Sequence, residues 1–373
     1  MGAVDSMGCR RGVAQRPCRS EGAPEATPEP QGTGDVVELI GALEDAGVAA
    51  GVPCDLCLLG VSSPGPLDAG IEPEFTEKVC VAPVGGDVAE VRSRLEREGV
   101  AVACIKGRKP EQPNQDTFFF ADTPRFRIAC IADGHGEFGH WASHWAVRAA
   151  LRILLVELAG AEALPEDEAV VRIYDTVHSA IVHQSGRDGY NLSLSGTTFT
   201  VALIDRVASQ VQLSWCGDSR CVLGRQGPRG PETVISTNDH KPQDPDERRR
   251  IIGSGGEVVR VYDDMPHRVF ARGKEAPGLA MSRALGDLMA HSVGVVHIPG
   301  CKRCAVLAGQ VVLLCSDGVW EFIKNAEALR IVMTMGRARA VEAADALALE
   351  ARDRWLKEEG SVTDDITAIV IWF

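Results

Sequence analysis

The stretch Arg127–His140 constrains the fold of this 373-residue chain more than any other. It opens with the apolar run Ile128–Ala132, which predicts a buried strand, and the run ends on the carboxylate of Asp133. Three glycines and two histidines follow before a long helical pattern begins. A buried charge is costly unless something pairs with it, and glycines let a ligand approach the backbone closely. We therefore expect a polar site at the edge of a sheet.

Two simpler interpretations of this stretch compete with a polar site. The spacing Gly134-x-Gly136-x-x-Gly139 matches a dinucleotide-binding fingerprint. That fingerprint expects a second strand ending in an acid about 20 residues later, whereas the chain keeps a helical pattern to about His183. Asp133 would also repel a pyrophosphate. A helix-capping role for Asp133 accounts for one carboxylate but leaves the others in the chain unexplained.

Aspartates stand at the ends of several predicted apolar strands. They are Asp116, Asp133, Asp218, Asp317 and Asp364. If these strands share a sheet or a sandwich, the carboxylates gather on one rim and repel one another unless cations lie between them. Oxygen ligands without a matching Cys or His cluster select hard ions such as Mg²⁺ or Mn²⁺. Two such ions support in-line phosphoryl displacement, so the pattern predicts a two-metal hydrolase.

The composition is that of an ordinary soluble globular protein, with 45% hydrophobic and 24% charged residues. The net charge of −13 argues against nucleic acid as the main partner. The twelve cysteines are scattered and no apolar secretory segment precedes them, which predicts free thiols in the cytoplasm. The pairs Cys54/Cys57 and Cys301/Cys304 are too far apart in the sequence to suggest one zinc ribbon. No apolar run reaches the roughly 18 residues of a membrane span.

The chain before residue 76 is divided into two parts. Residues 1–34 predict a flexible tail whose start fits myristoylation of Gly2. A single acyl chain binds membranes marginally, so acylation of Cys9 or the four nearby arginines would supply a second signal for peripheral attachment. The alternative is an unmodified disordered tail. Residues 35–75 are interpreted as a variable extension with no assignable function.

Residues 76–373 predict an α+β sandwich, because strand runs are interleaved with helix pairs. The expected strands are Lys78–Val84, Val100–Ile105, Thr117–Ala121, Arg127–Asp133, Thr197–Ile204, Gln210–Trp215, Cys221–Gly224, Val311–Cys315 and Ile366–Phe373. The expected helices are Asp87–Glu98, Trp141–Ala159, Glu166–Gln184, Pro245–Gly253, Asn325–Met335 and Ala338–Glu359. Gly255–Gly278 is expected to be irregular.

Eight motifs in this region, taken in order, resemble the metal-dependent protein serine/threonine phosphatases of type 2C. They are Asn114-Gln115-Asp116, Asp133-Gly134-His135-Gly136, Ser195-Gly196-Thr197-Thr198, Gly217-Asp218-Ser219-Arg220, Asp239-His240-Lys241-Pro242, Ser282-Arg283-Ala284-Leu285-Gly286-Asp287, Asp317-Gly318-Val319-Trp320 and Asp364-Asp365-Ile366-Thr367. The resemblance implies two stacked antiparallel β-sheets flanked by helix pairs. It also implies that phosphoserine and phosphothreonine proteins are the substrates. We expect a monomer.

The resemblance also implies a role for each matching acid. Asp133 would bridge two Mg²⁺ or Mn²⁺ ions, and the carbonyl of Gly134 would bind one of them. Asp317 and Asp364 would bind the other ion. Asp116 would hold a metal-bound water, and a hydroxide bridging the ions would attack the phosphorus.

Four further residues carry roles in the resemblance. His135 would protonate the leaving alkoxide, the alternative being a turn histidine. Asp218 resembles the ligand of a weaker third metal, the alternative being a hairpin-turn aspartate. The family's phosphate-binding arginine is replaced by Glu111. Because the local spacing is longer, Lys109 or Arg108 would supply the cation.

A catalytically inactive scaffold or binding module is the competing function. Relatives of that kind typically lose metal-binding aspartates, whereas Asp133, Asp317 and Asp364 are all present. A cysteine-based phosphatase would need a His-Cys-x5-Arg loop, which the sequence lacks. We therefore expect an active metal-dependent phosphatase.

Overall fold

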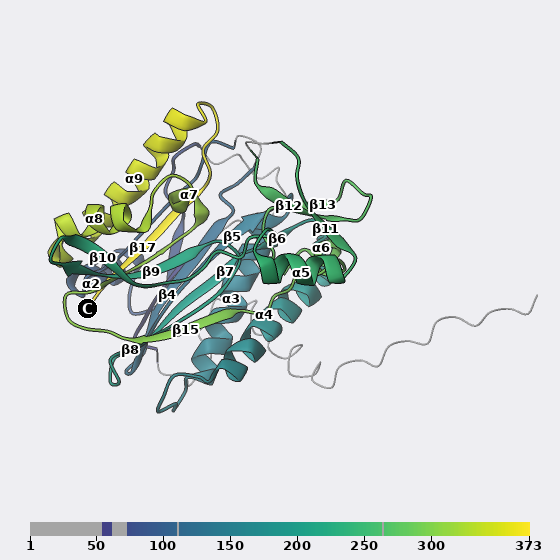
Figure 1. Ribbon diagram of the computed structural model, residues 1–373. Helices are drawn as coiled ribbons and strands as arrows, with labels where there is room; N and C mark the ends of the chain where they lie inside the picture. Colours follow the sequence, from purple (N-terminus) through teal and green to yellow (C-terminus); the bar gives the residue numbers. More distant parts are fainter. Residues whose placement is uncertain (1–53, 62–72, 110–111, 263–264) are drawn as a thin grey trace, which may run out of the picture.

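The computed structural model describes residues 54–61, 73–109, 112–262 and 265–373. Its centre is a pair of antiparallel sheets (Figure 1). The main path of the large sheet runs, in spatial order, through β15 (Gly300–Ala305), β8 (Gln210–Cys216), β7 (Phe199–Asp205), β5 (Phe126–His135), β4 (Asp116–Asp122), β1 (Leu56–Gly60) and β2 (Cys80–Val84). The short strands β6 (Gly196–Thr197) and β14 (Leu285–Gly286) extend this sheet beside the end of β5. The second sheet runs through β10 (Gly230–Ser236), β9 (Arg220–Gly227), β16 (Val311–Cys315), β17 (Ile366–Trp372) and β3 (Val100–Ile105).

The two sheets stack face to face over a shared apolar core. Alternate residues of a strand point to opposite faces, so Phe118 and Phe120 of β4 enter this core together with Leu314 of β16 and Ile369 of β17. Phe119 points the other way, into a separate core beneath the helices. Both faces of the central strands are therefore buried, which explains why they read as continuous apolar runs rather than as alternating ones.

Helix pairs cover the outer faces of the two sheets (Figure 1). α3 (Gly139–Glu157) and α4 (Asp167–Asp188) pack on the large sheet. α8 (Asn325–Met335) and α9 (Ala340–Glu358) pack on the second sheet. The layers confirm the predicted α+β sandwich of two stacked antiparallel sheets. Within the described ranges, no helix combines the length and apolarity that crossing a bilayer requires.

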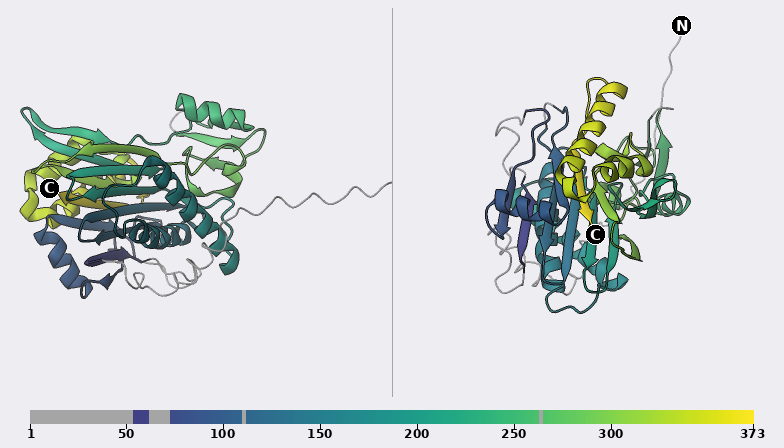
Figure 2. Two further views of the ribbon diagram at one scale, coloured as in Figure 1. Left: turned by 90° about the horizontal axis from the view of Figure 1, so that it is seen from below. Right: turned by 90° about the vertical axis from the view of Figure 1, so that its left-hand side faces the viewer.

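The segment Gly255–Gly278, expected to be irregular, instead contributes to a three-stranded sheet. Its strands are β11 (Gly256–Arg260), β12 (His267–Ala271) and β13 (Pro277–Leu279). This sheet and α5 (Pro245–Gly253) form a lobe beside one end of the sandwich (Figure 2). Ile251 and Val269 are fully buried in a small core of their own there. The prediction was wrong because the strands are short and only a few of their residues are apolar.

The strand β1 lies within residues 35–75, which the sequence analysis had assigned to a variable extension. It pairs with β4 on one side and with β2 on the other. The predicted domain boundary at residue 76 thus leaves out a strand of the large sheet. Leu56 and Leu58 of β1 are buried in the core between the sheets. The boundary was placed too late in the chain because the sequence around this short strand is rich in Gly and Pro.

Truncation of Leu58 tests whether β1 supports the domain. Leu58 is 1% exposed, so Leu58→Ala should lower the free energy of unfolding by about 2–5 kcal/mol. Urea denaturation measures this change. Val207→Ala is the matched control, because Val207 is 72% exposed and should change stability by no more than about 0.5 kcal/mol. Equal stabilities of the two variants would show that β1 contributes little to the folded domain.

Candidate metal centre and active site

The site begins where β4 and β5 lie side by side. Their register places Asp116 directly opposite Asp133, and like charges in such a pair destabilise a sheet. Asp116 is fully buried. Its Oδ2 accepts hydrogen bonds of 2.7 Å from Ser316 Oγ and from Thr367 Oγ1. Since Ser316 follows β16 and Thr367 lies in β17, both sheets contribute to this end of the site.

The other predicted acids reach the same place from the second sheet. Asp317 begins the short helix α7 (Asp317–Trp320), with Ser316 between this helix and β16, and Asp364 stands just before β17. Burial raises the pKa of Asp133 well above its ordinary value, and the negative charges of three neighbours raise it further. These neighbours are Asp116, Asp317 and Asp364. The structure therefore brings together the acids that the sequence placed at separate strand ends.

Asp317 shows the same electrostatic crowding. Burial raises the pKa of Asp317 well above its ordinary value, followed by the negative charges of Asp364 and Asp218. Asp317 also contacts Asp133. For Asp116, burial and the charge of Asp365 raise the pKa to about 6. The charged forms of Asp116, Asp133 and Asp317 are thus all destabilised.

Several carboxylate oxygens at this site have no protein hydrogen-bond partner among the described residues. They are the Oδ1 atoms of Asp116, Asp218 and Asp317. Leaving a buried charged oxygen unpaired is costly. The donor set consists of hard carboxylate oxygens, which suits Mg²⁺ or Mn²⁺. The residues present therefore fit a pair of divalent cations.

The carbonyl of Gly134 is the other predicted metal ligand. Gly134 lies next to Asp133 in β5, where it pairs with Thr197 of β6. A Cβ atom at this position would lie 2.1 Å from the carbonyl oxygen of Gly139 and 2.8 Å from that of Gln115. Only glycine fits between these backbone segments without displacing them, so packing alone requires a glycine at position 134.

Comparison with known proteins assigns the chain to a family. The family model described as Protein phosphatase 2C matches residues 104–359. The chain belongs to the protein phosphatase 2C family. The family is metal-dependent. This chain is a protein serine/threonine phosphatase.

Plant proteins and solved structures show the same relationship. The chain is 34% identical over 314 residues to "Probable protein phosphatase 2C 34" of Arabidopsis thaliana, covering 79% of this chain and 83% of that protein. It is 32% identical over 268 residues to "Probable protein phosphatase 2C 73" of the same plant, covering 65% of this chain and 69% of that protein. The structure of a serine-threonine phosphatase 2C from Toxoplasma gondii aligns with a TM-score of 0.62 at 22% identity, covering 74% of this chain and 94% of that chain. At this identity the structural similarity supports the fold.

His135, the predicted general acid, has a partner that the sequence analysis did not assign. His135 Nε2 lies 2.6 Å from Asp287 Oδ2. The strand β5 continues past its predicted end at Asp133 to His135, and β6 pairs with both β5 and β14. This arrangement brings Asp287, the residue after β14, beside His135. A Cβ atom at Gly196 of β6 would lie 2.2 Å from Asp287 Oδ2, so a glycine there makes room for the pair.

Asp287 changes the protonation of His135. Burial lowers the pKa of the imidazole, but the charge of Asp287 and the hydrogen bond to it outweigh burial and raise the pKa of His135 above its ordinary value. The Asp287 side chain is almost fully buried, and its backbone adopts a left-handed conformation with φ of 47°. The sequence signal was the acid at the end of the motif that begins at Ser282, but nothing local indicated its partner.

The two predicted phosphate-binding residues lie in different surroundings. Lys109 Nζ forms an ion pair with Asp364 Oδ1 inside the site, and the nearby acids raise the pKa of Lys109 against the opposing effect of burial. Arg108 Nε instead pairs with Glu74 Oε2 at 2.9 Å, and its guanidinium lies over the ring of Phe75. Only Lys109 therefore contacts the cluster of acids.

The segment that carries Lys109 is held by Asp365, another residue to which the sequence analysis gave no role. Its Oδ1 accepts from Gly107 N at 2.7 Å, and its Oδ2 accepts from Gln115 N at 2.9 Å. A Cβ atom at Gly107 would lie 2.2 Å from the carbonyl oxygen of Thr363. Asp365 thus fixes both ends of the loop between β3 and β4 against the entrance of β17.

Asp218, the candidate ligand for a third metal, lies directly after β8. Its Oδ2 accepts a 2.6 Å hydrogen bond from Lys241 Nζ. The neighbouring His240 is neutral near pH 7, because burial and Arg283 lower its pKa to about 3. His240 stacks on Trp215 and its Nδ1 accepts from Gly217 N at 3.2 Å. These contacts hold the His240 ring within the protein, which is a structural role.

Asp116 gives a pH prediction for the metal-free protein. The folded protein keeps Asp116 protonated up to about pH 6, whereas the unfolded chain releases this proton near its ordinary pKa of 3.8. The folded state therefore binds more protons in this window, and the contribution of Asp116 to the free energy of unfolding falls as the pH rises. In EDTA, Asp116 should make the free energy of unfolding of the wild type fall by up to about 1.4 kcal/mol per pH unit between about pH 4 and 6. Asp116→Asn should remove this fall.

Chemical denaturation at several pH values measures this difference. The exposed Asp353→Asn is the control, because it lies outside the acidic cluster. Mg²⁺ should reduce the effect at Asp116, since a nearby cation favours charged carboxylates. The interpretation would be contradicted by parallel stability curves for wild type and Asp116→Asn in EDTA.

Proposed function

We propose that the chain hydrolyses phosphoserine and phosphothreonine in proteins, with two Mg²⁺ or Mn²⁺ ions at the acidic site. Asp133, Gly134, Asp317 and Asp364 would hold the ions. When bound, the two ions would lower the pKa of a water molecule and offset the charge of the phosphoryl group. The observation that carries this proposal is the gathering of buried and half-buried aspartates from both sheets, with carboxylate oxygens left unpartnered within the described residues.

Asp116 would orient the attacking water. Its Oδ2 is fixed by Ser316 and Thr367, while its Oδ1 has no hydrogen-bond partner among the residues described. The free oxygen can therefore accept a hydrogen bond from water. Because the hydroxyl groups hold the carboxylate rigidly, little freedom remains to be lost when the water binds.

His135 would give a proton to the departing serine or threonine oxygen. Asp287 fixes its ring through Nε2 at 2.6 Å and favours the protonated form. An alkoxide is a poor leaving group, so a positioned acid contributes strongly to its departure. Asp287 is a positioning residue in this scheme, since its contact is with His135.

Lys109 is the better candidate for holding the substrate phosphate, because it lies within the acidic cluster whereas Arg108 pairs with Glu74. As a point charge, a lysine gives weaker orientation than a bidentate arginine. Asp218 would hold a weaker third ion. The ion pair between Lys241 and Asp218 Oδ2 leaves only Oδ1 unpartnered there within the described residues.

Phosphate release with and without metal tests the two-metal mechanism. A phosphothreonine peptide should be hydrolysed with Mn²⁺ or Mg²⁺ and not with EDTA. Asp133→Asn should abolish most of this activity, while the exposed control Asp353→Asn should retain it. Activity that survives chelation would contradict the two-metal mechanism. Absence of activity in the metal-loaded wild type would contradict the proposed hydrolysis.

The role of His135 can be separated from metal binding by changing the leaving group. His135→Ala should lower kcat on a phosphothreonine peptide by about 10²–10⁴-fold. On an aryl phosphate, whose leaving group needs little protonation, the loss should be much smaller. Steady-state kinetics with both substrates measures the difference. Equal losses on the two substrates would argue against proton donation by His135.

The predicted lipidation sites Gly2 and Cys9 lie outside the described residues. Peripheral membrane attachment through them, a cytoplasmic location and a monomeric state remain predictions. The intact mass of the protein purified from eukaryotic cells tests the first, because myristoylation of Gly2 after removal of Met1 gives a defined mass increase. An unmodified mass would remove the basis for attachment through Gly2.

A further inference from the structure

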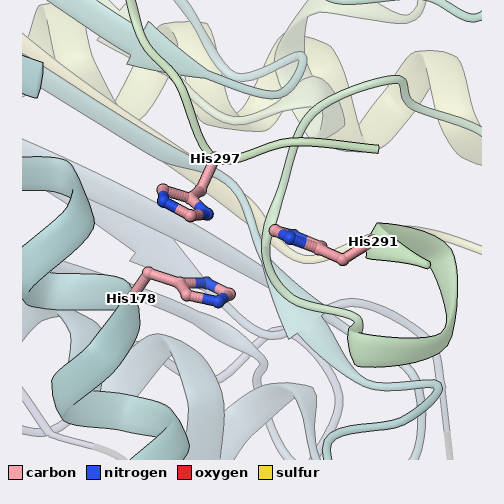
Figure 3. A group of neighbouring side chains, drawn as sticks. All are labelled: His178, His291 and His297. Carbon is pink, nitrogen blue, oxygen red and sulfur yellow. The ribbon is translucent and has the colours of Figure 1, made fainter. Parts of the chain in front are cut away.

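Three histidines, His178, His291 and His297, lie close together (Figure 3). His178 lies on α4, His291 ends the short helix α6 (Leu288–His291), and His297 precedes β15. Each offers a ring nitrogen, and these three nitrogens all lie within 4.8 Å of one another. The rings are nearly parallel, with centroid distances between 4.2 and 5.4 Å. The phosphatase mechanism proposed above uses none of them.

We propose that His178, His291 and His297 form a binding site for a borderline transition-metal ion, with Zn²⁺ as the representative. Imidazole is a preferred ligand of Zn²⁺ and its neighbours in the first transition row. Three histidines and a water molecule form a known kind of zinc coordination. The oxygen-rich acidic site selects hard cations instead, so the two sites would take different metals.

The hydrogen bonds of two of these rings set the tautomer that a metal requires. His291 Nε2 lies 3.0 Å from the carbonyl oxygen of Ala284, and His297 Nε2 lies 3.0 Å from Asp175 Oδ1. Both oxygens accept in these contacts, so each Nε2 carries the proton and each Nδ1 keeps its lone pair. Donation of the opposite N–H to a carbonyl or carboxylate is the usual support of a metal-bound histidine.

His297 gives the most direct indication of a metal site. Its Nδ1 is buried and has no hydrogen-bond partner among the described residues. An unpartnered buried nitrogen is unfavourable, and a metal ion would satisfy it. The carboxylate of Asp175 is exposed on its outer side, so it can orient His297 without filling the space between the three rings.

His178 is the third member of the cluster, and it accepts a hydrogen bond that would compete with metal binding. Its Nδ1 accepts from Gly286 N at 3.2 Å, which is long for such a bond. Coordination through Nδ1 would replace this hydrogen bond. Burial and the two neighbouring histidines lower the pKa of His178 to about 2, and burial also lowers that of His291. Both rings are therefore neutral at pH 7, which is the form that binds metals.

The geometry requires only a local adjustment. Zinc–nitrogen bonds of about 2.0–2.1 Å in a tetrahedron place the nitrogens about 3.3 Å apart. The three nitrogens would therefore draw together by at most about 1.5 Å and turn their lone pairs inward. The rings stack nearly parallel, so their side-chain torsions must turn before the in-plane lone pairs converge on one ion.

Zinc binding to the full chain tests the proposal. The protein is stripped with EDTA, returned to excess Mg²⁺ to load the acidic site, and dialysed against Zn²⁺. One tightly bound zinc per chain is expected, and Asp133→Asn should keep it. Substitution by Co²⁺ should give the intense visible absorption of a tetrahedral nitrogen-rich site. Octahedral cobalt at carboxylates absorbs far more weakly.

Variants locate the bound ion. His291→Ala and His297→Ala should lose the zinc, and Asp175→Ala should weaken its binding by about 10–100-fold. His183→Ala is the matched control, because His183 is an exposed histidine on the same helix as His178. Thermal unfolding in EDTA checks that each variant folds, and Asp175→Ala changes only an exposed side chain.

Three results would overturn the proposal. They are the absence of bound zinc in the wild type, retention of full zinc affinity by folded His297→Ala and Asp175→Ala, and loss of the zinc in Asp133→Asn. The first would mean that the stacked rings serve packing alone. The third would place the ion at the acidic site instead.

Discussion

The repulsion among buried carboxylates is the constraint on which the rest of this structure depends. Asp116 and Asp133 are opposed in register, and Asp317 and Asp364 add their charges from the other sheet. Such an arrangement opposes folding unless protons, lysines or cations offset it. The apolar core between the sheets, and the helix-covered cores outside them, supply the stabilisation that tolerates it. Stability and function are thus in opposition at one end of the sandwich.

The same packing that stabilises the domain also assembles the site. β4 and β5 belong to the large sheet, whereas β16 and β17 belong to the second. Ser316 and Thr367 reach from the second sheet to Asp116, so the carboxylate is oriented only when the sheets are stacked. A change in the core that altered the spacing of the sheets would therefore also displace the acids, even at a distance from the chemistry.

The sequence predicted those features that are local or repeated. Val311–Cys315 and Asn325–Met335 were predicted with the bounds that the structure has. A continuous apolar run and a helical periodicity can both be recognised in a sequence without knowledge of tertiary contacts. The convergence of the acids was predicted because each stands at a strand end. The partnership of His135 with Asp287 could not be, since 152 residues separate them and β6 and β14, which join them in space, are only two residues long. The choice between Lys109 and Arg108 likewise depended on Glu74, which no motif includes.

One helical turn links the proposed general acid to the histidine cluster. Asp287 precedes α6, and its side chain contacts His135. His291 ends the same turn, and its backbone N–H donates to the backbone carbonyl of Asp287. Gly286, which directly precedes Asp287, donates its backbone N–H to His178 Nδ1. A metal ion that replaced the Gly286 bond would act one residue from the carboxylate that orients His135. Closely packed segments transmit small displacements. An ion bound by the three histidines would therefore shift Asp287 and, through it, the orientation of His135.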